Sequence, residues 1–193
     1  FTLNDAVVIV SQHKRMTFCE YALHKKCIVI LPGFSGEQWP LRSRYNVNSV
    51  VTVANGIALQ PSQEVTKYIQ LLSPGFDFMV LGAQNRSESE VVYITPTSFV
   101  DLKTLLAYQA VYVNTVVGHS FGMSPMEAMV TGLPLVTGGC PDILYNFAFD
   151  TWNCFVSQES PLCSISFIRD RIRWLFKHSE EAEIMGKRGR EVI

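Results

Sequence analysis

The fold of this chain is written most clearly in Val111–Val136, which reads VYVNTVVGHSFGMSPMEAMVTGLPLV. Residues 111–114 form a short, mostly β-branched run that predicts a strand. Residues 118–122 are too rich in glycine for a helix and too polar for a core strand, so they predict a loop. Residues 133–136 are apolar again and predict a second strand. The order strand, loop, helix, strand is typical of a βαβ unit.

A short helix is predicted between these two strands. Ser124 can act as its N-cap, Pro125 suits its first position, and Glu127 stands where a capping-box partner of Ser124 would stand. Gly132 suits its C-terminal end. Residues 122–126 then present unpaired N–H groups at a helix N-terminus, and the helix dipole adds positive potential there. This arrangement predicts an anion-binding site.

Apolar runs of strand length alternate with helical stretches along the rest of the chain. Further strands are expected at residues 5–10, 27–31, 49–53, 78–81, 91–94 and 153–156. Further helices are expected at residues 12–26, 61–72, 101–109 (capped by Asp101), 164–178 and 180–192. The alternation predicts an α/β fold, a Rossmann-like parallel sheet with helices on both faces. Ligands of such sheets bind beyond the carboxyl ends of the strands, where residues 121–124 and 137–139 are expected.

Composition narrows the functional classes. The chain has 193 residues and a formal net charge of -1, which argues against a nucleic-acid-binding protein. Its five cysteines are odd in number and form no Cys-x-x-Cys pair, which favours a reducing, cytoplasmic environment over a disulfide framework. No apolar run approaches the roughly 20 residues that a membrane span needs. The chain opens on Phe1 and stops within a helical pattern, so we expect a fragment of a longer protein.

The central stretch resembles the donor-site signature of retaining GT-B glycosyltransferases of the glycosyltransferase family 4 (group 1) type. The family pattern Glu-Gly-Phe-Gly, Glu-Ala-Met and Gly-x-Pro-Val-Val is matched, at the same spacing, by residues 119–122, 127–129 and 132–136. The first glutamate of the pattern is replaced by His119. The resemblance implies three segments: residues 1–35 as the end of the N-terminal GT-B domain and crossover, 36–48 as a linker, and 49–193 as the nucleotide-sugar-binding C-terminal domain. Most of the N-terminal GT-B domain would then be missing from this sequence.

The resemblance also implies roles for single residues. Glu127 matches the glutamate that holds the donor's ribose hydroxyls, although its local pattern alone favours a helix cap. His119 takes the catalytic position beside the donor sugar, with an unassigned loop histidine as the alternative. The remaining donor-binding positions are implied to be Asn55, Gly56, Ser120, Phe121, Gly122, Met123, Ser124, Gly138 and Gly139. No metal ion or cofactor is expected, and the donor is a UDP- or GDP-sugar.

Two functions remain open at this point. The first is transfer of a hexose from the nucleotide sugar to an acceptor with retention of configuration. The second is a catalytically retired GT-B-like domain that serves as an interaction or assembly module. The second is favoured by the absence of any lysine or arginine between Arg44 and Lys67, where the family places two cations that face the diphosphate. Arg42 and Arg44 can supply this charge only if the linker brings them to the site. A dinucleotide-dependent oxidoreductase is discounted because no Gly-x-Gly-x-x-Gly follows the first strands.

The expected partners follow from the first function. They are the nucleotide-sugar donor, a glycan, lipid-linked or protein acceptor, and the missing N-terminal domain, with no nucleic acid. The helix expected at residues 164–178 carries Arg169, Arg171, Arg173 and Lys177 opposite apolar residues, which is usually a solvated face. Peripheral contact with a membrane is the alternative for this face.

Overall fold

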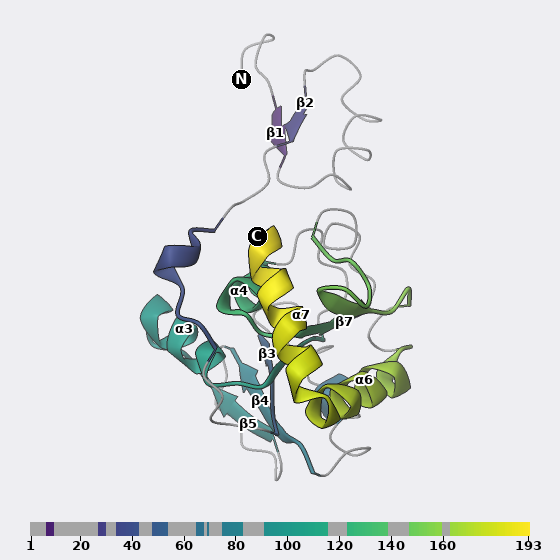
Figure 1. Cartoon of the computed structure of the whole chain (residues 1–193). Helices are drawn as coiled ribbons and strands as arrows, with labels where there is room; N and C mark the ends of the chain where they lie inside the picture. The colour runs from purple at the N-terminus through teal and green to yellow at the C-terminus, as the bar shows by residue number, and fades with distance from the viewer. Residues whose placement is uncertain are drawn as a thin grey trace.

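The computed structural model describes residues 7–9, 27–29, 34–42, 48–53, 65–67, 69, 75–82, 91–115, 123–138, 147–159 and 163–193. Its centre is a six-stranded, all-parallel sheet in the order β5-β4-β3-β6-β7-β8 (Figure 1). The strands are β3 (Ser49–Val53), β4 (Asp77–Leu81), β5 (Val91–Ile94), β6 (Val111–Asn114), β7 (Leu135–Thr137) and β8 (Cys154–Val156). The helices are α3 (Phe99–Ala107), α4 (Met123–Thr131), α6 (Ile165–Lys177), α7 (Ser179–Val192) and the 3-10 turn η1 (Gly36–Gln38). Residues 65–67 and 69 are also helical.

A separate two-stranded parallel sheet pairs β1 (Val7–Ile9) with β2 (Cys27–Val29). Both strands lie within the runs that the sequence predicts, although the described segments are shorter. The predicted helix between them, at residues 12–26, lies outside the described residues.

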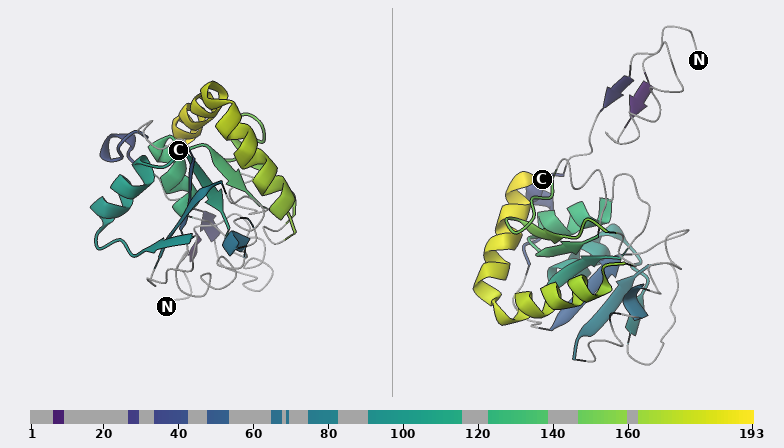
Figure 2. Two further views of the ribbon diagram at one scale, coloured as in Figure 1. Left: turned by 90° about the horizontal axis from the view of Figure 1, so that it is seen from below. Right: turned by 90° about the vertical axis from the view of Figure 1, so that its right-hand side faces the viewer.

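The large sheet has a hydrophobic core on each face because alternate residues of a strand point to opposite sides. One core joins Val51, Val53 and Tyr112 to buried residues of α3 and α4. The other joins Val50 and Val111 to buried residues of α6 and α7. Figure 2 shows the sheet between these two helical layers. The predicted fold, a Rossmann-like parallel sheet covered by helices on both faces, is confirmed.

The predicted helix at residues 101–109 begins earlier than the sequence suggested. Helix α3 starts at Phe99, and the Ser98 side chain accepts a hydrogen bond from the Asp101 N–H at 3.1 Å. Ser98 is therefore the N-cap, and the prediction that Asp101 caps this helix is wrong. Asp101 accepts a hydrogen bond from Thr97 instead, and this contact is the main reason why the pKa of the exposed Asp101 carboxyl is lowered. Both residues are good N-caps, and only the backbone geometry decides between them.

The predicted N-cap of the central helix is also displaced. Helix α4 begins at Met123, so Ser124 and Pro125 lie inside its first turn. Proline is tolerated there because the first four N–H groups of a helix have no partner within it. The predicted end is confirmed: Gly132 has a φ of 84°, and the Leu133 N–H bonds the Ala128 carbonyl at 3.0 Å. This is the Schellman arrangement that glycine favours.

Residues 34–42, which include residues 36–42 of the expected linker, pack onto the sheet domain. Trp39 is only 5% exposed and belongs to the core beside α3 and α4. The Arg42 N–H donates to the Thr131 carbonyl at the C-terminal end of α4, at 2.8 Å. An aromatic anchor, Trp39, therefore holds these residues against the core. The proposed domain boundaries stay a prediction.

Candidate functional site

The strand order predicts a ligand crevice at one edge of the sheet. The chain builds outward from β3 in one direction, to β4 and β5, and then returns to build β6, β7 and β8 on the other side. In a doubly wound sheet, the ligand lies outside the carboxyl ends of the strands at the point where this direction reverses. That point lies between β3 and β6, which pair through Val50 with Val111 and Val51 with Tyr112.

Buried polar side chains line the carboxyl edge of the sheet beside this crevice. The hydroxyls of Thr52 and Thr115 are hydrogen-bonded at 2.8 Å across β3 and β6. The Asn114 amide donates to the Thr137 hydroxyl at 3.0 Å, which links β6 to β7. Paired polar groups of this kind fix the strand ends because a buried hydroxyl or amide without a partner costs free energy. Sequence reasoning missed them, although polar residues that end apolar strands are a readable signal.

Helix α4 places its N-terminal turn and the Glu127 carboxyl at this edge. Met123 is exposed, whereas Ser124 and Glu127 are half-buried. Burial raises the pKa of Glu127. Glu127 also influences Tyr112 electrostatically, and Tyr112 lies on β6 beside the crevice. A partly desolvated carboxylate at a helix N-terminus is suited to accept hydrogen bonds from ligand hydroxyls.

The helix-cap alternative for Glu127 fails in this structure. Because α4 begins at Met123, Glu127 is the fifth helical residue and does not stand at the capping-box position. Within the described residues, its side chain makes no hydrogen bond or ion pair. No group in the described ranges therefore competes with a ligand for this carboxylate.

An apolar recess adjoins this edge on the β5 side. It has a volume of about 440 Å³ and is lined mainly by residues at the carboxyl ends of β3, β4 and β5 and at the start of α3. Its lining includes Val53, Leu81, Gly82, Thr95, Ser98, Phe99 and Leu102. Val53 connects the recess to the α4 site, because it lines the recess and its backbone lies close to the Tyr112 phenol. A flat apolar group and an anion can thus be held side by side along one edge.

Several predicted site residues lie outside the described part of the chain. They are Asn55, Gly56, His119, Ser120, Phe121, Gly122 and Gly139. Their proposed roles stay predictions. Gly138 is described: it is buried just after β7, and its carbonyl accepts a hydrogen bond from Thr137 at 2.8 Å. The structure brings Met123, Ser124 and Glu127 together on the first turns of α4.

Arg42 does not supply the charge that the stretch between Arg44 and Lys67 lacks. Its backbone is held at the C-terminal end of α4. The nine residues of α4 span roughly 13 Å, and this length separates Arg42 from the N-terminal turn of the helix. Its side chain lines a different cavity, of about 490 Å³, together with Ala110 and Val111 at the amino edge of the sheet. Arg44 lies outside the described residues.

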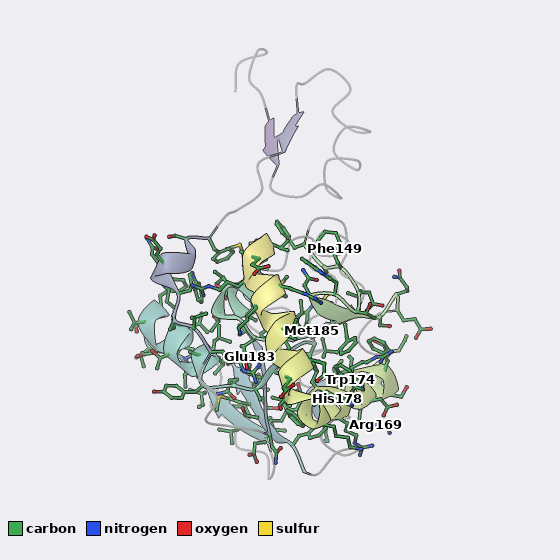
Figure 3. All side chains as sticks on the ribbon, in the orientation of Figure 1. Phe149, Arg169, Trp174, His178, Glu183 and Met185 are labelled. Carbon is green, nitrogen blue, oxygen red and sulfur yellow. The ribbon has the colours of Figure 1, made fainter. Side chains whose placement is uncertain are left out.

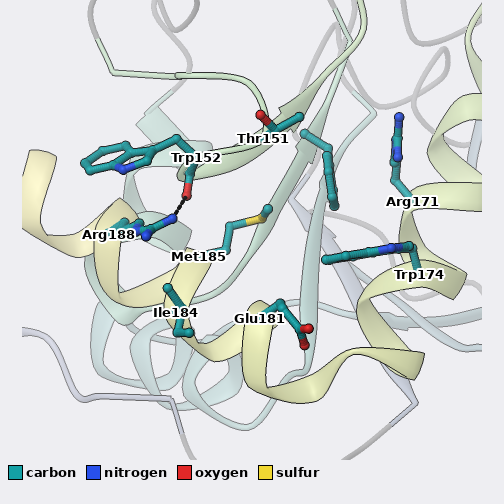
Figure 4. Close-up of a pocket in the computed structure, with 9 residues that line it drawn as sticks. Thr151, Trp152, Arg171, Trp174, Glu181, Ile184, Met185 and Arg188 are labelled. Carbon is teal, nitrogen blue, oxygen red and sulfur yellow. Dashed lines mark hydrogen bonds between the residues drawn. The ribbon is translucent and has the colours of Figure 1, made fainter.

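A third recess, of about 460 Å³, lies between the turn before β8 and helices α6 and α7 (Figure 4). Its walls carry Trp152, Trp174, Arg171 and Arg188, and the Arg188 guanidinium donates to the Trp152 carbonyl at 3.4 Å. Trp174 is also stacked on His178, with the ring centroids 4.3 Å apart (Figure 3). Because Trp152 precedes β8, this recess opens near the amino end of that strand, away from the candidate site.

The described part of the chain contains neither a cluster of metal ligands nor a membrane-spanning helix. No group of three or more histidine, cysteine, aspartate or glutamate side chains among them is placed to hold a metal ion. None of the helices in the described ranges combines the length and the apolar character that crossing a membrane requires.

Comparison with known proteins gives the class of fold. No family model matches the chain, and no curated protein does. Among solved structures, TarM superimposes with a TM-score of 0.77 at 16% identity, over 96% of this chain and 39% of TarM. HepE of Anabaena, solved with UDP and glucose, gives 0.78 at 15% identity, over 97% and 57% of the two chains. The C-terminal domain of LpcC, a glycosyl transferase group 1 family protein of Francisella tularensis, gives 0.67 at 12% identity, over 83% and 96%.

These similarities establish the fold of the chain, and they show how much of each related structure the chain spans. The chain has the helix-flanked parallel sheet of the Rossmann-like domains in GT-B glycosyltransferases. It spans about two fifths of TarM and less than three fifths of HepE, whereas it covers nearly all of the LpcC C-terminal domain.

Proposed function

We propose that this chain is the donor-binding half of a glycosyltransferase that moves a hexose from a nucleotide-diphosphate sugar to an acceptor with retention of configuration. The observation that carries the proposal is the position of α4: its N-terminal turn and the half-buried Glu127 carboxyl lie at the reversal point of the sheet. Anions bind at helix N-termini, and open α/β sheets bind ligands at this edge.

Each part of the donor has a matching feature. The Glu127 carboxylate accepts hydrogen bonds from the ribose hydroxyls. The N–H groups of Met123 and Ser124 face the diphosphate, where preorganised dipoles stabilise the charge of the leaving group. The nucleotide base occupies the apolar recess beside Val53 and Phe99. His119, Asn55 and Gly56 are proposed for the sugar and phosphates from the family resemblance alone. The proposal has three further parts. The donor binds without a metal ion, the acceptor is a glycan, a lipid-linked molecule or a protein, and the protein is cytoplasmic.

The second candidate is a retired donor site in an interaction or assembly module. This candidate is favoured because residues 45–66, where the family places two cations that face the diphosphate, contain no lysine or arginine. Charge-assisted hydrogen bonds to phosphate are roughly twice as strong as neutral ones. A site without such cations holds a diphosphate more weakly, and His119 does not reproduce the charge of the family's glutamate.

Calorimetric titration with UDP, GDP and their hexose conjugates separates the two candidates. The donor-site proposal predicts saturable binding of one nucleotide to this chain, strongly weakened in Glu127→Gln. Glu180→Gln is the matched control, because Glu180 is exposed on α7. Binding of neither nucleotide by folded protein would overturn the enzyme proposal and leave the interaction module.

A further inference from the structure

Tyr112 is a fully buried phenol directly below the candidate site. It is the second residue of β6, and its ring packs in the core that β3 shares with α3 and α4. Its hydroxyl oxygen is buried as well, and it has no hydrogen-bond partner within the described part of the chain. Sequence reasoning treated this residue only as part of an apolar strand.

The surroundings of the hydroxyl point toward the first turns of α4. The Ser124 side chain and the Val53 backbone lie near enough to lower the pKa of Tyr112, and Glu127 lies near enough to raise it. Burial is the largest influence and raises this pKa overall, so the phenol keeps its proton. None of these neighbours, however, makes a hydrogen bond of ordinary geometry with the hydroxyl. A protonated donor thus lies beside Ser124 without a hydrogen bond.

Packing alone does not explain a hydroxyl at this position. Phenylalanine would fill the same space without burying an unpaired polar group, which costs folding free energy. Other buried polar side chains at this edge are paired: Thr52 with Thr115, and Asn114 with Thr137. Hydrogen bonds of a ligand site are often long or poorly aligned before the ligand binds, and an unpaired hydroxyl near the first turns of α4 fits that state.

We propose that Tyr112 is a positioning residue of the donor site: with a nucleoside diphosphate bound, its hydroxyl donates a hydrogen bond to the Ser124 hydroxyl, which in turn donates to a phosphate oxygen. This inference rests on the proposed function. The step is a change of hydrogen bonding, and no covalent bond forms or breaks.

These two hydrogen bonds, from Tyr112 to Ser124 and from Ser124 to the phosphate, form a relay. The relay follows from the hydrogen-bonding capacity of a serine. A hydroxyl has one proton and accepts through two lone pairs. When Tyr112 occupies the accepting side of Ser124, the serine proton is directed toward the anion. Each hydrogen bond in such a chain polarises the next, so the phosphate receives a stronger donor than serine alone provides. This neutral relay partly offsets the missing lysine and arginine.

Calorimetry and thermal unfolding of Tyr112→Phe test the relay. We expect the dissociation constant for UDP or GDP to rise roughly fivefold, which is the loss of one ordinary hydrogen bond. The unfolding temperature should stay the same or rise, because the substitution removes an unpaired buried hydroxyl. Tyr108→Phe is the matched control, because Tyr108 is 52% exposed just after α3. The double variant Tyr112→Phe/Ser124→Ala should bind no more weakly than Ser124→Ala, since both substitutions break one chain.

A comparison with the nucleosides separates the relay from a structural effect. Uridine and guanosine lack phosphate, so the relay predicts that Tyr112→Phe leaves their binding unchanged. Equal diphosphate binding by Tyr112→Phe and the wild-type chain would overturn the relay while the proposed function stands. Parallel losses of unfolding temperature, nucleoside binding and diphosphate binding would also overturn it, because they indicate a packing role. If the wild-type chain binds neither diphosphate, the proposed function fails and the relay fails with it.

Discussion

Arg190 of the C-terminal helix donates hydrogen bonds to the carbonyl oxygen of Trp39, 151 residues earlier in the chain, with its Nη2 atom at 3.3 Å. The same guanidinium donates to the carbonyls of Gly36 and Val130. Lys103 of α3 holds the other side of this segment, through the Gln38 carbonyl at 2.7 Å and the Trp39 ring at 4.9 Å. Residues 34–42 are therefore clamped to the sheet domain by α7, α4 and α3 together.

Replacing Arg190 with alanine should release this segment. Three carbonyl oxygens lose a charged donor in a partly buried place, and we expect the free energy of unfolding to fall by about 2 kcal/mol. Chemical denaturation measures the loss, and the emission of Trp39 should shift to the red as its ring becomes exposed. Lys187→Ala on the same helix is the control: its ion pair with Glu183 is exposed and worth about 0.3–0.5 kcal/mol. Equal effects of the two substitutions would contradict the clamp.

Two glycines of α7 should respond oppositely to alanine. A Cβ atom on Gly186 would overlap the Gly132 carbonyl of the turn after α4, which is backbone and cannot rotate away. Gly186→Ala should therefore cost about 3 kcal/mol or more, or prevent folding, because overpacking forces two elements apart. A Cβ atom on Gly189 would lie 3.6 Å from Met129, which is an ordinary contact. Gly189→Ala should be neutral or stabilising by up to about 1 kcal/mol, since alanine favours a helix.

The shifted pKa of Glu127 predicts a pH dependence. Burial raises this pKa above its ordinary value of 4.5, so the folded state binds more protons than the unfolded state between the two values. The contribution of Glu127 to the free energy of unfolding therefore falls as pH rises through that window, and its full cost is present at neutral pH. Glu127→Gln should match or exceed the stability of the wild-type chain at pH 7, and the difference should vanish below pH 4.5. Stability that rises with pH across the window only in the wild-type chain would contradict this sign.

Nucleotide binding should follow the same titration in the opposite sense. A protonated Glu127 accepts ribose hydroxyls poorly, so affinity should weaken as pH falls through its raised pKa. Loss of a charged hydrogen bond is worth about 1.5–3 kcal/mol, or roughly 10- to 150-fold in the dissociation constant. Titrations of the wild-type chain and Glu127→Gln across pH test this expectation. The variant should bind weakly at every pH.

The proposed position of the base predicts an effect of Phe99. Its ring is 54% exposed and lines the recess beside Val53. Stacking of a base on an aromatic ring is worth about 1–3 kcal/mol, so Phe99→Ala should weaken nucleotide binding at least roughly fivefold. Phe99→Tyr should keep most of the affinity. Phe149→Ala is the control, because Phe149 is similarly exposed and does not line this recess. A nucleotide that binds Phe99→Ala normally would place the base elsewhere.

Much of the sheet is predictable from local sequence because its central strands, β3 and β6, are buried on both faces. The strands expected at residues 49–53, 91–94 and 111–114 have these bounds in the structure. All five residues of β3 and all four of β6 are buried, so their apolar runs carry the signal directly. The helix caps were less predictable, because several neighbouring residues can cap and the backbone geometry selects one.

Some features of the candidate site were likewise predictable from local sequence, whereas others depend on long-range contacts. The sequence alone established the order strand, loop, helix, strand and the helix end at Gly132, because these depend on residues a few positions apart. Only the tertiary structure decided that Trp39 is buried, that Arg190 holds its carbonyl, and that Tyr112 lies near Ser124 and Glu127. Contacts between residues so far apart in the chain depend on how the layers pack. No local pattern of polar and apolar residues encodes that packing by itself.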